Sequence, residues 1–263
     1  MPELPDVEVY KRYVDSTSLH QTMRAVEIRL PDLLGTVSRE ELRTHLLDHS
    51  FQTTHRHGKY LFLLLNDGYS LVLHFGMTGF PVYYANPENA SDHIRLRVTF
   101  ATGYHFAYNC QRKLGLIDLT EDINSYINTK NLGRDAYDDD FTFAEFKNMM
   151  QNRRGAVKSA LMNQNIIAGL GNIYSDEVLF QAGIHPQTAV PLLDESELKQ
   201  IFSEIKRVLQ TSIQSLGAHK QFPDTFLLTH RKPGASCPLC NGEIIKKNIS
   251  GRSSYLCSDH QSK

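Results

Sequence analysis

The chain has 263 residues, of which 41% are apolar and 22% charged, a composition typical of a globular protein with a sizeable core. No apolar run reaches the roughly 20 residues that a membrane-spanning helix requires, so an integral membrane protein is not expected. The first residues carry Glu3, Asp6 and Glu8 in place of the basic and apolar regions of a cleavable signal. We therefore expect a cytoplasmic protein with no membrane partner.

Charge is unevenly distributed, although the formal net charge is only −1. Residues 218–263 contain seven Lys or Arg and three Asp or Glu, a net charge of +4, which leaves 21 basic and 26 acidic residues, a net of −5, in residues 1–217. Phosphate binding needs a local basic patch rather than a basic total. The C-terminal segment is therefore compatible with a nucleic-acid contact.

The first half of the chain predicts an antiparallel β domain. Apolar residues at helical spacing behind Pro5 predict a first helix over residues 6–16. Hairpin turns at Asn66-Asp67-Gly68 and Thr102-Gly103 interrupt a series of strand-like runs. The eight runs are 26–30, 51–55, 60–65, 71–75, 80–84, 94–100, 104–108 and 115–119. This pattern predicts a sandwich or barrel spanning residues 1–125, of which we favour a β-sandwich with a flanking helix.

The second half predicts a helical domain and then a small β module, so the fold class is α+β and multidomain. Residues 126–140, with three consecutive aspartates, predict a linker. Thr142 to Glu145 form a capping-box pattern that opens a helix. Three more helices are expected, at 156–163, at 171–182 and from Asp194 to Gly217. The helical domain is thus expected at 141–217 and the small module at 218–263.

The small module contains a pattern of metal ligands. Cys237-x2-Cys240 and Cys257-x2-His260 are two close pairs separated by sixteen residues. Such pairs can close a tetrahedron around Zn²⁺, and a site filled by four protein ligands is structural. The sequence therefore predicts one structural zinc ion. Cys110 stands alone in a predicted strand, where a buried apolar role is expected.

The N-terminus offers an unusual nucleophile. Removal of Met1 would leave Pro2 with a free secondary amine, beside the carboxylate of Glu3. An α-amino group has a reference pKa of roughly 7.7–8.0, so a neutral fraction exists near pH 7. One interpretation is an amine that forms an iminium with a sugar C1′, with Glu3 moving protons. The alternative is a rigid start before a helix.

A Gly-x-Gly pattern, Gly169-Leu170-Gly171, precedes Asn172 between two predicted helices. The free backbone N–H groups of a helix start can bind an anion, and Lys158 in the preceding helix favours phosphate. The alternative is that the glycines permit close packing of two helices.

Two loops and two turns carry further candidates. Two apolar residues, Met77 and Leu114, are interpreted either as wedges that fill a gap in a base stack or as core residues. In the first interpretation Arg112, near Leu114, pairs with the orphaned base. Lys59 and Arg252 lie at predicted tight turns, where a phosphate contact and an ordinary solvated cation are the two alternatives.

These motifs together resemble, over nearly the whole chain, the formamidopyrimidine-DNA glycosylase/endonuclease VIII (Fpg/Nei) family. The resemblance rests on four segments in the family's order: residues 2–8, the runs 57–60 and 74–79, the helix–two-turn–helix run 164–177, and the four metal ligands. It implies a base-excision-repair DNA glycosylase with AP-lyase activity on damaged double-stranded DNA. It also implies a Schiff-base intermediate and β,δ-elimination.

The resemblance assigns roles to residues of this chain. Pro2 would attack C1′ and Glu3 would act as acid and base. Phosphate and active-site contacts would come from Lys59, His74, Asn172 and Arg252, and the residues inserted at the flipped lesion would be Met77, Arg112 and Leu114. Glu177 matches an acid near the active site.

The chain departs from the family's pattern in three places: at the metal site, at residues 109–114 and in the segment before Cys237. His260 stands where a cysteine is usual, Leu114 where an aromatic is common, and residues 109–112 differ from the usual Asp-Pro-Arg-Arg run. Only about twenty residues separate Gly217 from Cys237, where the Fpg branch carries a longer loop over 8-oxoguanine. Formamidopyrimidines, oxidised pyrimidines or abasic sites are then the expected substrates. Two competing hypotheses are a catalytically silent damaged-DNA-binding protein and a single-strand nucleic-acid chaperone.

Overall fold

The computed structural model describes residues 1–86, 88 and 90–261. The chain divides into two compact units. The first comprises residues 1–2 and 6–130, and the second comprises residues 3–5 together with the chain from Asn131 onward. Helix α1 (Leu4–Thr17) begins in the second unit and continues into the first.

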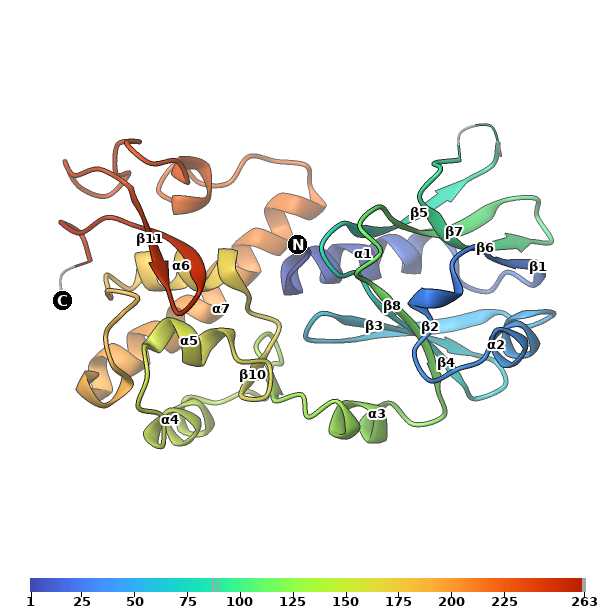
Figure 1. Ribbon diagram of the computed structural model, residues 1–263, viewed down its shortest axis with the longest axis horizontal. Helices are drawn as coiled ribbons and strands as arrows, with labels where there is room; N and C mark the ends of the chain where they lie inside the picture. The colour runs from blue at the N-terminus through green and yellow to red at the C-terminus, as the bar shows by residue number, and fades with distance from the viewer. Residues whose placement is uncertain (87, 89, 262–263) are drawn as a thin grey trace. The chain divides into compact units, whose positions relative to one another are not determined.

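The first unit is a sandwich of two four-stranded antiparallel sheets with α1 beside it (Figure 1). One sheet has the order β1-β6-β7-β5, formed by Met23–Ile28, Ile94–Phe100, His105–Cys110 and Gly79–Tyr84. The other has the order β2-β3-β4-β8, formed by Phe51–His57, Tyr60–Leu65, Ser70–His74 and Leu116–Thr120. The predicted β-sandwich is confirmed.

The pattern of apolar residues in each strand depends on which faces of its sheet are covered by other elements. Strand β6 alternates buried and half-buried residues, because only its inner face lies in the core. The β2-β3-β4-β8 sheet is also covered outside by helix α3 (Ile123–Thr129), whose Tyr126 packs edge-on against Phe62 at 5.9 Å between ring centroids. That second cover explains the continuous apolar run of β3. Cys110 is buried in this core, as expected.

Three elements of the first unit were not predicted. Helix α2 (Arg39–Leu46) begins with a capping box in which the Ser38 side chain accepts from Glu41 N and Glu41 accepts from Ser38 N. The Ser-x-x-Glu signature was thus present in the sequence. A short 3₁₀ turn, η1 (Pro31–Leu33), precedes it, and α3 extends into the segment expected to be a linker.

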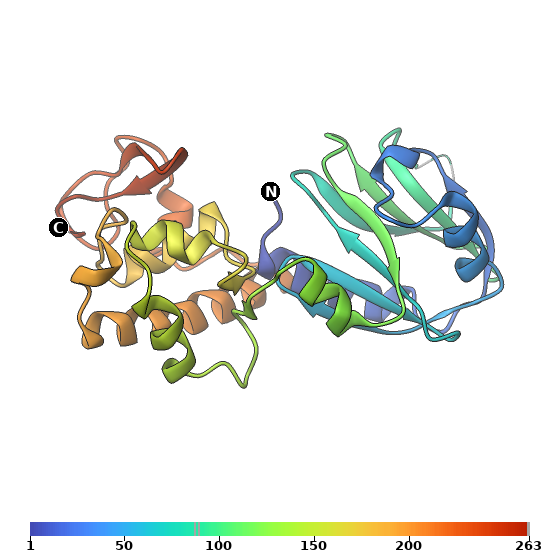
Figure 2. The ribbon, with the colours of Figure 1, turned by 60° about the horizontal axis from the view of Figure 1, so that its bottom comes forward.

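The second unit packs helices around one apolar core (Figure 2). The helices are α4 (Phe143–Gln151), α5 (Val157–Met162), α6 (Asn172–Gln181) and α7 (Glu195–Gly217), with the 3₁₀ turns η3 (Val190–Leu192) and η4 (Leu227–His230). Capping boxes at Thr142 and Asp194 open α4 and α7; the sequence predicted the first capping box and the helix start at Asp194. The residues expected to form a linker contain β9 (Arg134–Asp135), which pairs in parallel with β10 (Ile167–Ala168).

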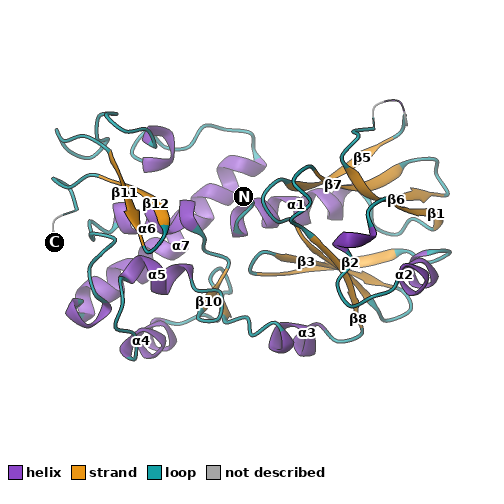
Figure 3. Cartoon of the chain, in the orientation of Figure 1, coloured by secondary structure: helices purple, strands orange, loops and turns teal. Residues whose placement is uncertain are grey.

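The chain ends in an antiparallel hairpin of β11 (Ile245–Ile249) and β12 (Arg252–Leu256) (Figure 3). Ser250 and Gly251 form its two-residue turn with φ of 51° and 77°. Positive φ at both central residues is the type I′ geometry that matches strand twist. Within the described residues, no helix is both long and apolar enough to cross a membrane.

Candidate active site and metal centre

The carboxylate of Glu3 binds the N-terminus of helix α6. It accepts hydrogen bonds from the backbone N–H groups of Gly171 at 2.7 Å, Ile173 at 2.9 Å and Tyr174 at 3.2 Å. Only 1% of Glu3 is exposed. Free N–H groups and the positive end of the helix dipole both stabilise a negative charge there. The helix start therefore holds Glu3 in one orientation.

This arrangement explains the Gly-x-Gly pattern. A Cβ on Gly171 would lie 2.4 Å from the Glu3 carboxylate, and a Cβ on Gly169, whose φ is 113°, would lie 2.4 Å from Leu4. The backbone of Leu4 also donates to Gly169 O at 3.1 Å. The start of α6 does bind an anion, as the sequence suggested. That anion is the carboxylate of the chain's own Glu3 and not a phosphate.

Pro2 is half-buried and directly precedes Glu3. Neighbouring Cα atoms are about 3.8 Å apart, so the fixed position of Glu3 restricts the Pro2 nitrogen to its vicinity. Met1 precedes Pro2 in the described chain, which makes that nitrogen an amide. Only removal of Met1 produces the secondary amine.

Lys59 and His74 lie close together in the first unit. Lys59 occupies the β2–β3 turn after Gly58, whose φ is 56°, and His74 ends β4 directly opposite Tyr60. Burial, and next the charge of Lys59, lower the pKa of His74 to about 4. Gly76 N–H donates to His74 Nδ1 at 3.3 Å. His74 is therefore a neutral imidazole with its proton on Nε2, suited to donate to a phosphate oxygen.

The low pKa of His74 makes stability fall on acidification. Between about pH 6.5 and 4 the unfolded chain protonates this imidazole and the folded protein does not, so stability is present above this window and is lost within it. We expect the unfolding free energy to decrease by about 2 kcal/mol more in the wild type than in His74→Gln between pH 7 and 5. Urea unfolding at both pH values measures this, with His219→Gln as an exposed control. Equal decreases in wild type and His74→Gln would contradict it.

Two adjoining loops of the first unit present exposed apolar side chains. Met77 is 38% exposed and Leu114 is 53% exposed. The loops meet closely, because a Cβ on Gly76 would lie 2.2 Å from Leu114 O, and Arg112 N donates to Thr78 Oγ1 at 3.0 Å. Arg112 is itself exposed. Met77 and Leu114 are thus not core residues, and the wedge interpretation is the better supported alternative.

The candidates of the second unit differ in exposure. Arg252 is exposed at the hairpin turn, and the Asn172 side-chain amide donates to Ser253 O at 2.9 Å. Lys158 is only 1% exposed, and its ammonium group is bound internally. This placement does not suit the DNA contact expected for Lys158.

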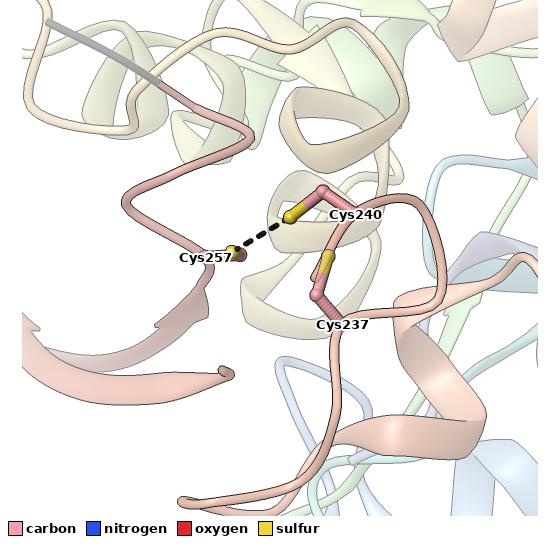
Figure 4. A group of neighbouring side chains, drawn as sticks. All are labelled: Cys237, Cys240 and Cys257. Carbon is pink, nitrogen blue, oxygen red and sulfur yellow. Dashed lines mark hydrogen bonds between the residues drawn. The ribbon is translucent and has the colours of Figure 1, made fainter. Parts of the chain in front are cut away.

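Three of the four predicted metal ligands lie together (Figure 4). The sulfur atoms of Cys237, Cys240 and Cys257 lie within 4.8 Å of one another, and those of Cys240 and Cys257 are 3.5 Å apart. Zn–S bonds of about 2.3 Å in a tetrahedron place the ligands roughly 3.8 Å apart, so the three thiols fit zinc. Gly242 N–H donates to Cys240 Sγ and is the largest cause of the lowered pKa of that thiol.

His260 does not join this group of sulfur atoms. Its Nε2 lies 2.8 Å from Phe180 O, and its ring packs on the Phe180 ring at 4.9 Å. Because a carbonyl only accepts, Nε2 carries the proton and Nδ1 keeps a lone pair available to a metal. His260 is therefore chemically able to complete the set, although the structure does not place it within that distance.

Sequence reasoning missed a cluster of charged residues in the second unit. Asp176 is buried, with Lys158 on one carboxylate oxygen and Arg231 on the other. Asp176 lies in the run 164–177 but was given no role there, and Arg231 belongs to none of the motifs named above. Glu177 is also buried and accepts from Leu227 N and Leu228 N, while burial raises its pKa to about 7. Its contacts connect α6 to η4, which is a structural role.

Comparisons with known proteins agree with this arrangement. The family model of the formamidopyrimidine-DNA glycosylase N-terminal domain matches residues 1–117, and that of the formamidopyrimidine-DNA glycosylase H2TH domain matches residues 132–223. The formamidopyrimidine-DNA glycosylase of Pelotomaculum thermopropionicum is 32% identical, with 98% of each chain covered. That of Protochlamydia amoebophila is 31% identical, with 100% of each chain covered.

Solved structures of the Lactococcus lactis enzyme Fpg are also similar. A complex with DNA containing an abasic site has a TM-score of 0.91 at 28% identity, covering 99% of this chain and 100% of the other. A complex of the wild-type enzyme with DNA containing N7-benzyl-Fapy-dG has the same TM-score and identity, with 100% of each chain covered. The chain therefore belongs to the formamidopyrimidine-DNA glycosylase family.

Proposed function

We propose that this protein is a bifunctional DNA glycosylase and AP lyase of base excision repair that acts on damaged double-stranded DNA. The observation that carries this proposal is the carboxylate of Glu3, fixed by three backbone N–H groups directly after Pro2. A carboxylate adjacent to a secondary amine is the pair that covalent amine catalysis requires.

The reaction proceeds through a covalent intermediate on Pro2. Its nitrogen forms a bond to C1′ of the damaged nucleotide, the glycosidic bond breaks, and the base departs with a proton. Ring opening, with Glu3 moving the proton, gives an iminium between the Pro2 nitrogen and C1′. Loss of a C2′ proton then expels the 3′ phosphate, and a second elimination expels the 5′ phosphate. Glycosylase and lyase activities therefore share one intermediate.

The remaining site residues act on the DNA itself. Lys59, Asn172 and Arg252 would bind phosphates, and His74 would donate from Nε2. Met77 and Leu114 would fill the space left by the flipped nucleotide, and Arg112 would pair with the orphaned base. Each unit thus contributes DNA contacts of its own.

A formamidopyrimidine is the substrate we favour over 8-oxoguanine. The short segment between Gly217 and Cys237 supports this preference, because it leaves little chain to cover a flipped 8-oxoguanine. The similar Lactococcus lactis structures hold abasic-site and N7-benzyl-Fapy-dG DNA. Single-turnover cleavage of duplexes that differ only in the lesion tests this. We expect faster cleavage of formamidopyrimidine, oxidised-pyrimidine and abasic duplexes than of 8-oxoguanine duplexes, and the reverse order would contradict it.

We further propose one structural Zn²⁺ bound by Cys237, Cys240, Cys257 and His260. The mutual distances of the three sulfur atoms and the free Nδ1 of His260 support it. The protein would work as a monomer in the cytoplasm, at the nucleoid in a prokaryote. A protein that bound lesion duplexes without cleaving any of them would instead support a catalytically silent damage-binding function, and equal affinity for undamaged single strands would support a chaperone.

A further inference from the structure

Lys158 is a buried cation whose ammonium group contacts three oxygen atoms. Its Nζ lies 2.6 Å from Asp176 Oδ1, 2.8 Å from Asn172 Oδ1 and 2.5 Å from Ser254 Oγ. The contacts with Asn172 and Ser254 are hydrogen bonds, and the contact with Asp176 is an ion pair. Because the acceptors lie on α6 and on β12, one side chain of α5 joins both elements.

The charge of Lys158 is neutralised inside the protein. Asp176 is 1% exposed, and its second oxygen binds Arg231 Nη2 at 2.5 Å and Tyr255 N at 3.1 Å. Arg231 also stacks over the Tyr255 ring at 4.6 Å. A cation paired in this way does not attract a phosphate as an exposed lysine does.

The same contacts determine which way the Asn172 amide points. An ammonium group only donates, so the atom facing Lys158 must be the amide oxygen, and Nδ2 must face the hairpin. One proton of Nδ2 binds Ser253 O at 2.9 Å. The second proton remains for an acceptor outside the protein. Without Lys158, the amide could turn and present its oxygen, which repels a phosphate.

We propose that Lys158 is a positioning residue: it orients the Asn172 amide toward a DNA phosphate and holds the hairpin in register with α6, without binding DNA itself. This inference rests on the proposed function of Asn172. In this arrangement the contact between Asn172 and a DNA phosphate depends on Lys158, a residue that does not itself contact DNA. It also explains why a lysine lies buried in a protein that binds a polyanion.

The salt dependence of DNA binding separates positioning from direct contact. Each phosphate contact made by a cation contributes about 0.9 to the slope of log K against log salt concentration. We expect Lys158→Met, which keeps an unbranched side chain without the ammonium group, to weaken duplex binding about tenfold with no change in slope. Arg252→Met, the matched exposed cation, should lower the slope by about 0.9. An equal fall in slope for Lys158→Met would overturn the proposal.

A double-mutant cycle distinguishes positioning of Asn172 from general stabilisation. Lys158→Met should weaken binding little or not at all in an Asn172→Ala background, because its effect passes through that amide. Additive losses, or a lower unfolding temperature with unchanged DNA affinity, would overturn the proposal. If Lys158→Met fails to fold, Ser254→Ala, which leaves the ion pairs of Asp176 with Lys158 and Arg231 in place, replaces it in the same cycle.

Borohydride trapping on an abasic duplex at saturating protein keeps the two proposals apart. We expect Lys158→Met to form the covalent adduct as the wild type does, because Pro2 and Glu3 are unchanged. Loss of the adduct in the variant alone would overturn the positioning role. Absence of an adduct with wild-type protein would instead contradict the proposed enzyme function.

Discussion

Replacing Glu3 with Gln is expected to slow strand cleavage about 10²- to 10⁴-fold, the usual contribution of a positioned acid–base group. The substitution removes the group that moves protons during ring opening and places an amide N–H₂ opposite backbone donors. Gly171 N and Ile173 N bind different carboxylate oxygens, so one of them must lose its acceptor. Single-turnover cleavage of abasic and formamidopyrimidine duplexes measures the change.

The matched control for Glu3→Gln is Glu8→Gln. Glu8 is a glutamate of helix α1 that pairs with Arg12 and Arg56 and takes no part in the proposed chemistry. Its variant should cleave at the wild-type rate. Duplex affinity should change by less than about tenfold in Glu3→Gln, because the carboxylate does not bind phosphate. Equal cleavage rates for wild type and Glu3→Gln would remove Glu3 from the mechanism.

Loss of the metal is expected to unfold the C-terminal module and to weaken DNA binding about 10- to 100-fold. Among the described residues, the buried apolar cluster around the cysteines comprises Phe180 of α6 with Leu227, Cys237, Ile244 and Cys257, and two of these five are proposed ligands. So small a core depends on a metal for its stability. The affinity loss corresponds to one charge-assisted hydrogen bond, that of Arg252 at the hairpin turn.

Cys257→Ala and chelation both test the metal prediction. We expect one zinc per wild-type chain and less than one in the variant, with faster amide exchange in the segment from Cys237 to Cys257. Cys110→Ala is the matched control, since it removes a buried cysteine of β7 outside the cluster and should keep the zinc. Full DNA affinity without metal would contradict a structural role for zinc in binding.

Local signals in the sequence were sufficient to predict most elements. The capping box at Thr142, the helix start at Asp194, the tight turn at Arg252 and the apolar alternation of β6 involve residues near one another in the chain. Helix α2 was missed although its capping box was present, because its short apolar pattern is weak beside the strands around it. The paired cysteines also formed a local signal.

The contacts that build the candidate site could not be derived in this way. Glu3 binds Gly171 across 168 positions, so its partner emerges only from the fold. The burial of Lys158 likewise depends on Ser254, 96 positions away. Met77 and Leu114 are exposed because of the way their two loops pack together. The sequence alone shows only that both residues are apolar, which does not distinguish a residue inserted into DNA from a core residue.

The most direct test of the proposed mechanism is the mass of the covalent adduct trapped by borohydride on an abasic duplex. Untagged protein from which Met1 has been removed should form the adduct, and peptide mapping should place it on the nitrogen of Pro2. Protein that retains Met1, in which this nitrogen is an amide, should form none. An adduct on a lysine, or full activity of protein with Met1 intact, would contradict the mechanism.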